Sequence, residues 1–129
     1  MSKQKKEALK KSFGYAFEGI FTGIRKERNM KIHCVVAVLV VAAGIILKLS
    51  PIEWCICLAL FGLVMALELV NTAIEAVVDL VMGEERHPLA KIAKDTAAGA
   101  VLIAALMSAT AGLIIFLPKA LIFVGLIKQ

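Results

Sequence analysis

The sequence predicts an all-α membrane protein with an amphipathic surface helix at the N-terminus and three transmembrane helices. The first observation is composition: 60% of the 129 residues are hydrophobic and the mean hydropathy is +0.88, well above the values of soluble proteins. The second is three apolar segments of spanning length, at about residues 32–49, 52–82 and 96–117. The third is a basic segment with helical periodicity at about residues 5–26. We expect residues 1–129 to form a single membrane domain.

The N-terminal segment combines an apolar face with many basic residues. Its apolar face comprises Leu9, Phe13, Phe17, Ile20 and Ile24. A basic amphipathic helix directly before a span predicts attachment to the anionic membrane surface. Nine of the fifteen basic residues precede the first span, which by the positive-inside rule predicts a cytoplasmic N-terminus and, after three spans, a C-terminus outside. The few aromatic residues do not alternate with Lys and Arg, so we expect no nucleic-acid partner despite the net charge of +5.

Turn-forming residues separate the three spans. Pro51 suits the first turn of the second helix, Gly83 its C-terminal cap, and Pro88 the start of the third helix. The second helix is long enough to project beyond the bilayer core on the cytoplasmic side. Pro118 is expected to end the third span. The apolar segment 120–127 is too short to cross, and we expect it to extend the helix or to lie on the outer surface.

A polar stripe interrupts the second span. Glu68, Asn71, Glu75 and Asp79 follow one another at spacings of three, four and four residues, which places them on one side of a helix. A carboxylate that meets lipid at the bilayer centre costs about 2.5 to 3.5 kcal/mol. The stripe is therefore expected to face protein, water or a ligand.

These polar residues suit phosphoryl transfer, which needs a divalent metal held by carboxylates, cations for the phosphates and an acceptor for the proton of the attacking hydroxyl. The chain has no phosphate loop, dinucleotide fingerprint or common metal motif. Glu75 suits Mg²⁺ at the membrane interface, and Glu27 is a second candidate if the surface helix folds back. Glu68 lies about 10 Å deeper along the helix, where a lipid hydroxyl would meet a base. The basic residues of the following loop and helix suit the phosphates: Arg86, His87 and Lys94.

Two other functional classes remain open from the residues alone. Intramembrane carboxylates also occur in proton relays and transporters, so the chain is alternatively a transport subunit. It is also compatible with a membrane scaffold whose acids pair between chains.

Two segments resemble the prokaryotic diacylglycerol kinase family, which are small integral membrane lipid kinases. They are ELVNTAIEAVVD at 68–79 and HPLAKIAKDTAAGAVLIAA at 87–105, and the resemblance extends over about residues 13–118. It implies a homotrimer in the bacterial cell membrane, with composite active sites between subunits at the cytoplasmic interface. The reaction it implies is transfer of the γ-phosphate of MgATP to a membrane-embedded alcohol.

The resemblance also implies roles for individual residues. By motif position, Glu68 is similar to the general base of the family and Asn71 supports it, while Glu27 and Glu75 match the carboxylates of the metal–ATP complex. The nucleotide site that the resemblance implies comprises Tyr15, Glu27, Glu75, Glu85, Arg86, His87, Lys94 and Asp95.

The family has two substrate branches, and three short segments favour one of them. ERNMKIH at 27–33, IEW at 52–54 and HPLAK at 87–91 look more like the undecaprenol kinase branch, with diacylglycerol as the alternative acceptor. The chain departs from the family pattern at Arg86, where some members have an aromatic residue, and at Ala8, where the family has an arginine.

Overall fold

A computed structural model describes residues 3–126, and all the regular secondary structure of this part is helical. Helix α1 comprises Lys3–Lys26, α2 Arg28–Ile46, α3 Pro51–Met82 and α4 Pro88–Phe123. The last three are each long and apolar enough to cross a membrane. The all-helical class and the three membrane spans of the sequence prediction are therefore confirmed.

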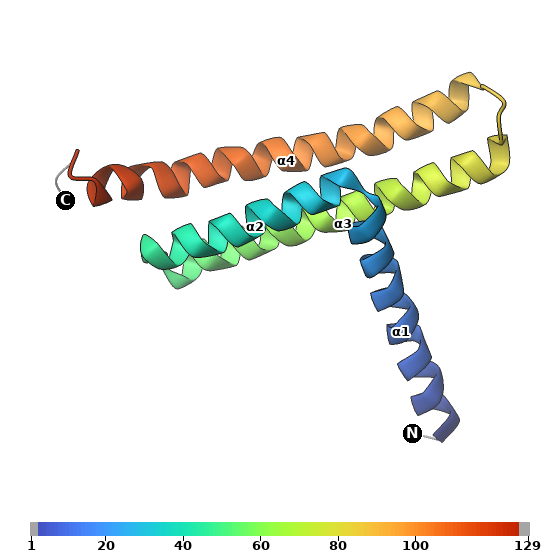
Figure 1. Cartoon of the computed structure of the whole chain (residues 1–129), viewed down its shortest axis with the longest axis horizontal. Helices are drawn as coiled ribbons and strands as arrows, with labels where there is room; N and C mark the ends of the chain where they lie inside the picture. The colour runs from blue at the N-terminus through green and yellow to red at the C-terminus, as the bar shows by residue number, and fades with distance from the viewer. Residues whose placement is uncertain (1–2, 127–129) are drawn as a thin grey trace.

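The helices form a bundle of α2, α3 and α4 from which α1 points away (Figure 1). α3 and α4 run antiparallel and pack along each other, and α2 packs on α3. The corner between α1 and α2 is the single extended residue Glu27, with φ −86° and ψ 127°. α1 also contacts α3, so the corner is held against the bundle.

Short turns with defined caps connect the helices. Ser50 and Glu53 form a reciprocal capping box at the start of α3, and Pro51 occupies its first turn. Glu53 also pairs with Lys119 of α4 at 3.2 Å. This ion pair joins the start of α3 to the last turns of the antiparallel helix α4. At the other end, Gly83 caps α3 with φ 56°, a conformation that favours glycine.

Two boundaries differ from the sequence prediction. α2 begins at Arg28 and ends at Ile46, so it starts and ends several residues earlier than the predicted span at 32–49. α4 runs beyond the predicted span end at Leu117, because it continues through Pro118 to Phe123, so the segment after Pro118 extends the helix, one of its two expected placements. Proline removes one backbone hydrogen bond, to Ile114, a loss that membrane helices tolerate when neighbouring groups and small backbone adjustments compensate for it.

The lateral surface of the bundle is apolar, which suits contact with lipid or with other copies of the chain. Large hydrophobic residues such as Val38, Leu58 and Ile114 are more than half exposed. The buried apolar residues of the described chain are few: Met30, Leu49, Val64, Ala97, Val101 and Ala104. A single chain buries too little to form the core of a soluble domain, in agreement with its three membrane-length helices.

Gly44 provides a test of the packing between α2 and α3. A Cβ atom at this position would lie 2.7 Å from Cη2 of Trp54, and the rigid indole cannot yield at its tip. We expect Gly44→Ala to destabilise the solubilised protein by about 1 to 3 kcal/mol, measured by thermal or denaturant unfolding in detergent. Gly19→Ala is the matched control, since nothing lies within 4 Å of the added Cβ, and it should leave stability unchanged or raise it. Equal effects of the two substitutions would contradict the close packing.

Candidate active site

The deeper half of the polar stripe is buried inside the bundle. Glu68 is 2% exposed and Asn71 is 8% exposed, although both lie on a membrane-spanning helix. Both line a cavity of about 250 Å³ between α2, α3 and α4. Glu68 Oε1 and Asn71 Oδ1 are buried without a hydrogen-bond partner. Buried polar atoms are normally satisfied, so these two oxygens indicate a ligand that donates hydrogen bonds or coordinates them.

Glu68 faces a histidine across this cavity. His33, in the second turn of α2, has its Nε2 atom 3.4 Å from Glu68 Oε1. The remaining lining residues include Asn29 of α2 and the small residues Ala98 and Ala105 of α4. The cavity therefore contains one acid, one imidazole and two amides in otherwise apolar surroundings.

The packing of the α1–α2 corner fixes the depth of these groups. Met30, three residues before His33, is fully buried. A Cβ atom at Gly23 would lie 2.7 Å from Leu69 Cδ2 and 3.7 Å from Met30 Cε, so α1, α2 and α3 meet at this point. Leu69 is adjacent to Glu68 in the chain. This packing holds the α1–α2 corner, which includes Glu27, against α3.

Glu75, the next acid of the stripe, is hydrogen-bonded to Asn71, one helical turn earlier on α3. Asn71 Nδ2 donates to Glu75 Oε1 at 3.0 Å, which orients the Glu75 carboxylate and leaves Asn71 Oδ1 free. Glu75 and Glu27 are both partly exposed, whereas Glu68 is not. Within residues 3–126, no group of three or more His, Cys, Asp or Glu side chains is arranged to hold a metal ion. A metal at this site would depend on one or two carboxylates and on the oxygens of a ligand.

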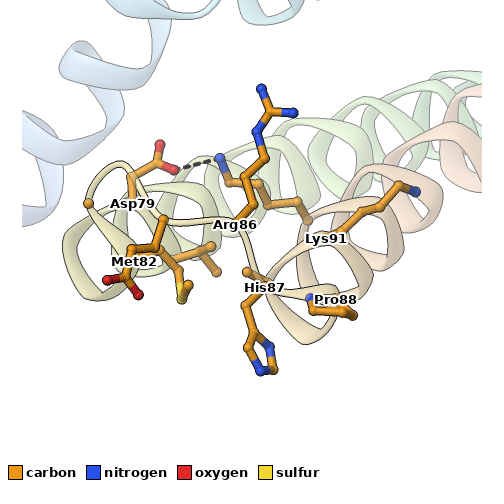
Figure 2. A pocket seen from close by; sticks show the side chains of 11 residues that line it. Asp79, Met82, Arg86, His87, Pro88 and Lys91 are labelled. Carbon is orange, nitrogen blue, oxygen red and sulfur yellow. Dashed lines mark hydrogen bonds and ion pairs between the residues drawn. The ribbon is translucent and has the colours of Figure 1, made fainter.

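A larger cavity lies at the turn between α3 and α4 (Figure 2). Its volume is about 470 Å³, and its lining includes Asp79, Glu85, Arg86, His87, Lys91 and Lys94. Lys94 Nζ donates to Asp79 Oδ1 at 2.6 Å, the interaction dashed in Figure 2, so the last acid of the stripe pairs with a lysine from α4. Arg86 and His87 extend from the turn in different directions. The excess of basic groups suits a phosphate-bearing ligand.

His87 also has a structural role in this turn. Its Nδ1 atom accepts a hydrogen bond from the backbone N–H of Leu89 at 3.2 Å, which caps the start of α4. The capped helix begins at Pro88, as the sequence predicts, and it presents Lys94 toward Asp79. The cap formed by His87 therefore fixes where α4 begins, and the position of α4 determines where Lys94 lies.

Four of the eight predicted nucleotide residues line none of the three cavities in a single chain: Tyr15, Glu27, Glu75 and Asp95. Asp95 pairs with Lys91 on the exposed side of α4 and does not line the large cavity. Tyr15 lies on α1 and is 71% exposed. Their predicted contacts with a nucleotide therefore remain expectations, as do the roles of Glu27 and Glu75 as a metal pair.

Sequence reasoning missed the contribution of α2 to the site. The sequence pattern assigns no catalytic or binding role to His33 or Asn29, yet both line the cavity of Glu68. A signal was present, because Asn29 and His33 are four residues apart and share one side of the helix that enters the membrane. The contact itself depends on the depth of α2 relative to α3, which the sequence pattern does not specify.

An apolar cavity continues from the site toward the other end of the bundle. It has a volume of about 360 Å³ and shares Ile32, His33 and Ala105 with the cavity of Glu68. Its lining residues from all three spanning helices include Val40, Phe61 and Phe116. A polar pocket with an apolar extension suits an amphiphile whose polar end reaches Glu68.

Fold and site together define a small membrane enzyme whose charged groups gather at one end of its spanning helices. The family model described as prokaryotic diacylglycerol kinase matches residues 14–116 of the sequence. The chain belongs to this family of lipid kinases.

Curated relatives of the chain include two kinds of lipid kinase. The undecaprenol kinase of Bacillus subtilis (strain 168) is 50% identical over 109 residues, which cover 84% of this chain and 88% of the relative. The diacylglycerol kinase of Synechocystis sp. is 46% identical over 110 residues, which cover 85% of this chain and 63% of the relative. The diacylglycerol kinase of Escherichia coli (strain K12) is 35% identical over 98 residues, covering 76% of this chain and 80% of the relative.

Proposed function

We propose that the chain transfers the γ-phosphate of ATP to the hydroxyl group of undecaprenol in the bacterial membrane. The observation that carries the proposal is the unpartnered, buried carboxylate oxygen of Glu68 at the junction of a polar and an apolar cavity. A long-chain alcohol matches this junction because its hydroxyl donates a hydrogen bond while its tail needs an apolar path.

In the proposed reaction, Glu68 acts as general base. Its Oε1 atom accepts the proton of the acceptor hydroxyl, whose oxygen then bonds to the γ-phosphorus as the bond to the β-phosphate oxygen of ATP breaks. The products are the lipid phosphate and ADP, and the proton stays on Glu68 until it is released to solvent. Asn71 orients the neighbouring Glu75 through the hydrogen bond at 3.0 Å.

Mg²⁺ fits the hard oxygen donors next to this base. Glu75 is oriented by Asn71, and Asn71 Oδ1 is buried without a partner, so an oxygen-preferring cation would satisfy it. We assign Glu75 and, from the corner of α1 and α2, Glu27 as the carboxylates that hold Mg²⁺. When bound, the ion neutralises charge on the phosphates.

The nucleotide is assigned to the basic cavity of the α3–α4 turn. Lys94, Arg86 and His87 supply positive or hydrogen-bonding groups there, and Glu85 lines the same cavity. Tyr15 and Asp95 are assigned by the family resemblance alone. Neither lines the cavity within one chain, and by the same resemblance we propose a homotrimer in which a neighbouring subunit completes each site.

The proposed topology follows the charge distribution. Nine of fifteen basic residues precede the first span, so the N-terminus and the active site face the cytoplasm and the C-terminus lies outside. α1 would lie on the anionic membrane surface, with its exposed Phe13, Phe17 and Phe21 in the interface.

The acceptor is tested by a direct comparison of two lipid alcohols. We expect the purified protein, with ATP and Mg²⁺, to phosphorylate undecaprenol faster than diacylglycerol, measured by transfer of labelled phosphate into the lipid fraction. The higher identity and coverage of the undecaprenol kinase relative support this order. Preference for diacylglycerol would reverse the substrate assignment, and transfer to neither lipid by folded protein would refute the kinase proposal.

The metal assignment is tested by changing one carboxylate. We expect Glu75→Gln to raise the Mg²⁺ concentration needed for half-maximal activity, because the amide cannot supply an anionic ligand. Glu84→Gln is the matched control, since Glu84 is an exposed residue of the turn that does not line the cavity. An unchanged Mg²⁺ requirement in Glu75→Gln would remove Glu75 from the metal site.

The competing proposal, a proton-relay subunit, lacks a polar route through the bundle. α3 has no charged residue at 54–67, and α4 has none at 96–118. Proton flux through liposomes containing the protein, in the absence of ATP, would support that alternative.

A further inference from the structure

His33 is the one basic side chain that lines the cavity of Glu68. Its Nε2 atom lies 3.4 Å from Glu68 Oε1, and the side chains are 22% and 3% exposed. The other polar lining residues, Asn29 and Asn71, carry neutral amides. Among the lining side chains, the imidazole of His33 is the one at ion-pair distance from this buried carboxylate.

The fold holds both members of the pair rigidly. His33 follows the fully buried Met30 by three residues, about one helical turn. Leu69, next to Glu68, packs against Gly23 at the end of α1, and Met30 contacts the same point. One packed corner thus fixes the depth of His33 on α2 and of Glu68 on α3.

The contact leaves the carboxylate able to react. At 3.4 Å, the pair is at ion-pair distance but is longer than most N–H···O hydrogen bonds, and Glu68 Oε1 has no hydrogen-bond partner. The imidazole nitrogen lies close enough to hold the direction of the carboxylate, while an oxygen lone pair stays free for the acceptor hydroxyl.

We infer that His33 is a positioning residue that orients the Glu68 carboxylate toward the acceptor hydroxyl. The inference rests on the proposed function, in which Glu68 takes the proton of a lipid alcohol. His33 itself exchanges no proton with the acceptor, so its contribution requires an N–H group at the Nε2 position and not an imidazole as such.

The test compares two substitutions at this position in the full-length purified protein. His33→Leu removes the N–H group, and His33→Gln places an amide N–H near the position of Nε2. We expect His33→Leu to lower kcat about 10- to 100-fold, with the KM for ATP unchanged, and His33→Gln to recover most of the loss. Val35→Leu is the control, because this exposed residue of the same turn lines neither cavity and should retain full activity.

Each outcome separates the inference from the proposed function. If the unsubstituted protein phosphorylates a lipid alcohol and His33→Leu retains its kcat, the role of His33 is overturned while the kinase proposal stands. Equal losses in His33→Leu and His33→Gln, with ATP binding intact, also overturn it. Should His33→Leu not fold, His33→Asn replaces it, since the shorter amide cannot reach Glu68; activity equal to that of His33→Gln would then overturn the inference.

Discussion

Replacing Glu68 by glutamine is expected to lower the rate of lipid phosphorylation by about 10²- to 10⁴-fold, the usual contribution of a general base. Glutamine keeps the size of the side chain but cannot accept the proton of the attacking hydroxyl. The buried position of Glu68 makes the substitution compatible with folding, because a neutral amide is cheaper to bury than a carboxylate. The measurement is kcat with labelled ATP and the lipid alcohol.

The affinity for ATP should distinguish a role of Glu68 as general base from a role in binding the nucleotide. Glu68 does not line the cavity at the α3–α4 turn, so Glu68→Gln should bind ATP with nearly unchanged affinity, measured by calorimetry or a fluorescent analogue. Loss of binding together with activity would contradict the role of Glu68 as base. Residual activity within a few-fold of the unsubstituted protein would contradict it as well.

Lys94→Met is expected to weaken ATP binding without abolishing the chemical step. Loss of one hydrogen bond to a charged phosphate costs about 1.5 to 3 kcal/mol, which corresponds to roughly 10- to 150-fold in the KM for ATP. The lysine is already held at the cavity by Asp79 at 2.6 Å, so its ammonium is in place before the nucleotide arrives. The measurement is the KM for ATP at saturating lipid.

Lys5→Met is the control for the loss of a positive charge. Lys5 lies on α1, is exposed and lines none of the three cavities, so the KM for ATP should not change. If Lys94→Met also left the KM unchanged, the basic cavity at the turn would not be the nucleotide site.

Hydropathy and local turn chemistry were sufficient to predict the helical architecture. Apolar segments of spanning length specify membrane helices because the bilayer leaves the backbone few alternatives. Pro51, Gly83 and Pro88 occur at the helix ends where the sequence places them. Pro118 does not end its helix, in agreement with the tolerance of membrane helices for proline, and the sequence alone left open whether the segment after it extends the helix.

The site was predictable along one helix but not between helices. The spacing of Glu68, Asn71 and Glu75 fixes their common side, and the first two prove to be buried. The pairing of Glu68 with His33 requires the axial offset and rotation of α2 against α3, which arise from the packing of Gly23, Met30 and Leu69. Periodicity in one segment carries no information about that offset.

The uncharged stretches of the spanning helices restrict where the product can go. Residues 34–47, 54–67 and 96–118 contain no Asp, Glu, Lys, Arg or His, so the spanning helices offer no counterion between Glu68 and the opposite end of the bundle. A newly formed phosphate monoester carries charge that hydrocarbon excludes. The headgroup is therefore retained in the leaflet in which it is made, and any use of the lipid phosphate on the opposite face requires a separate translocation step.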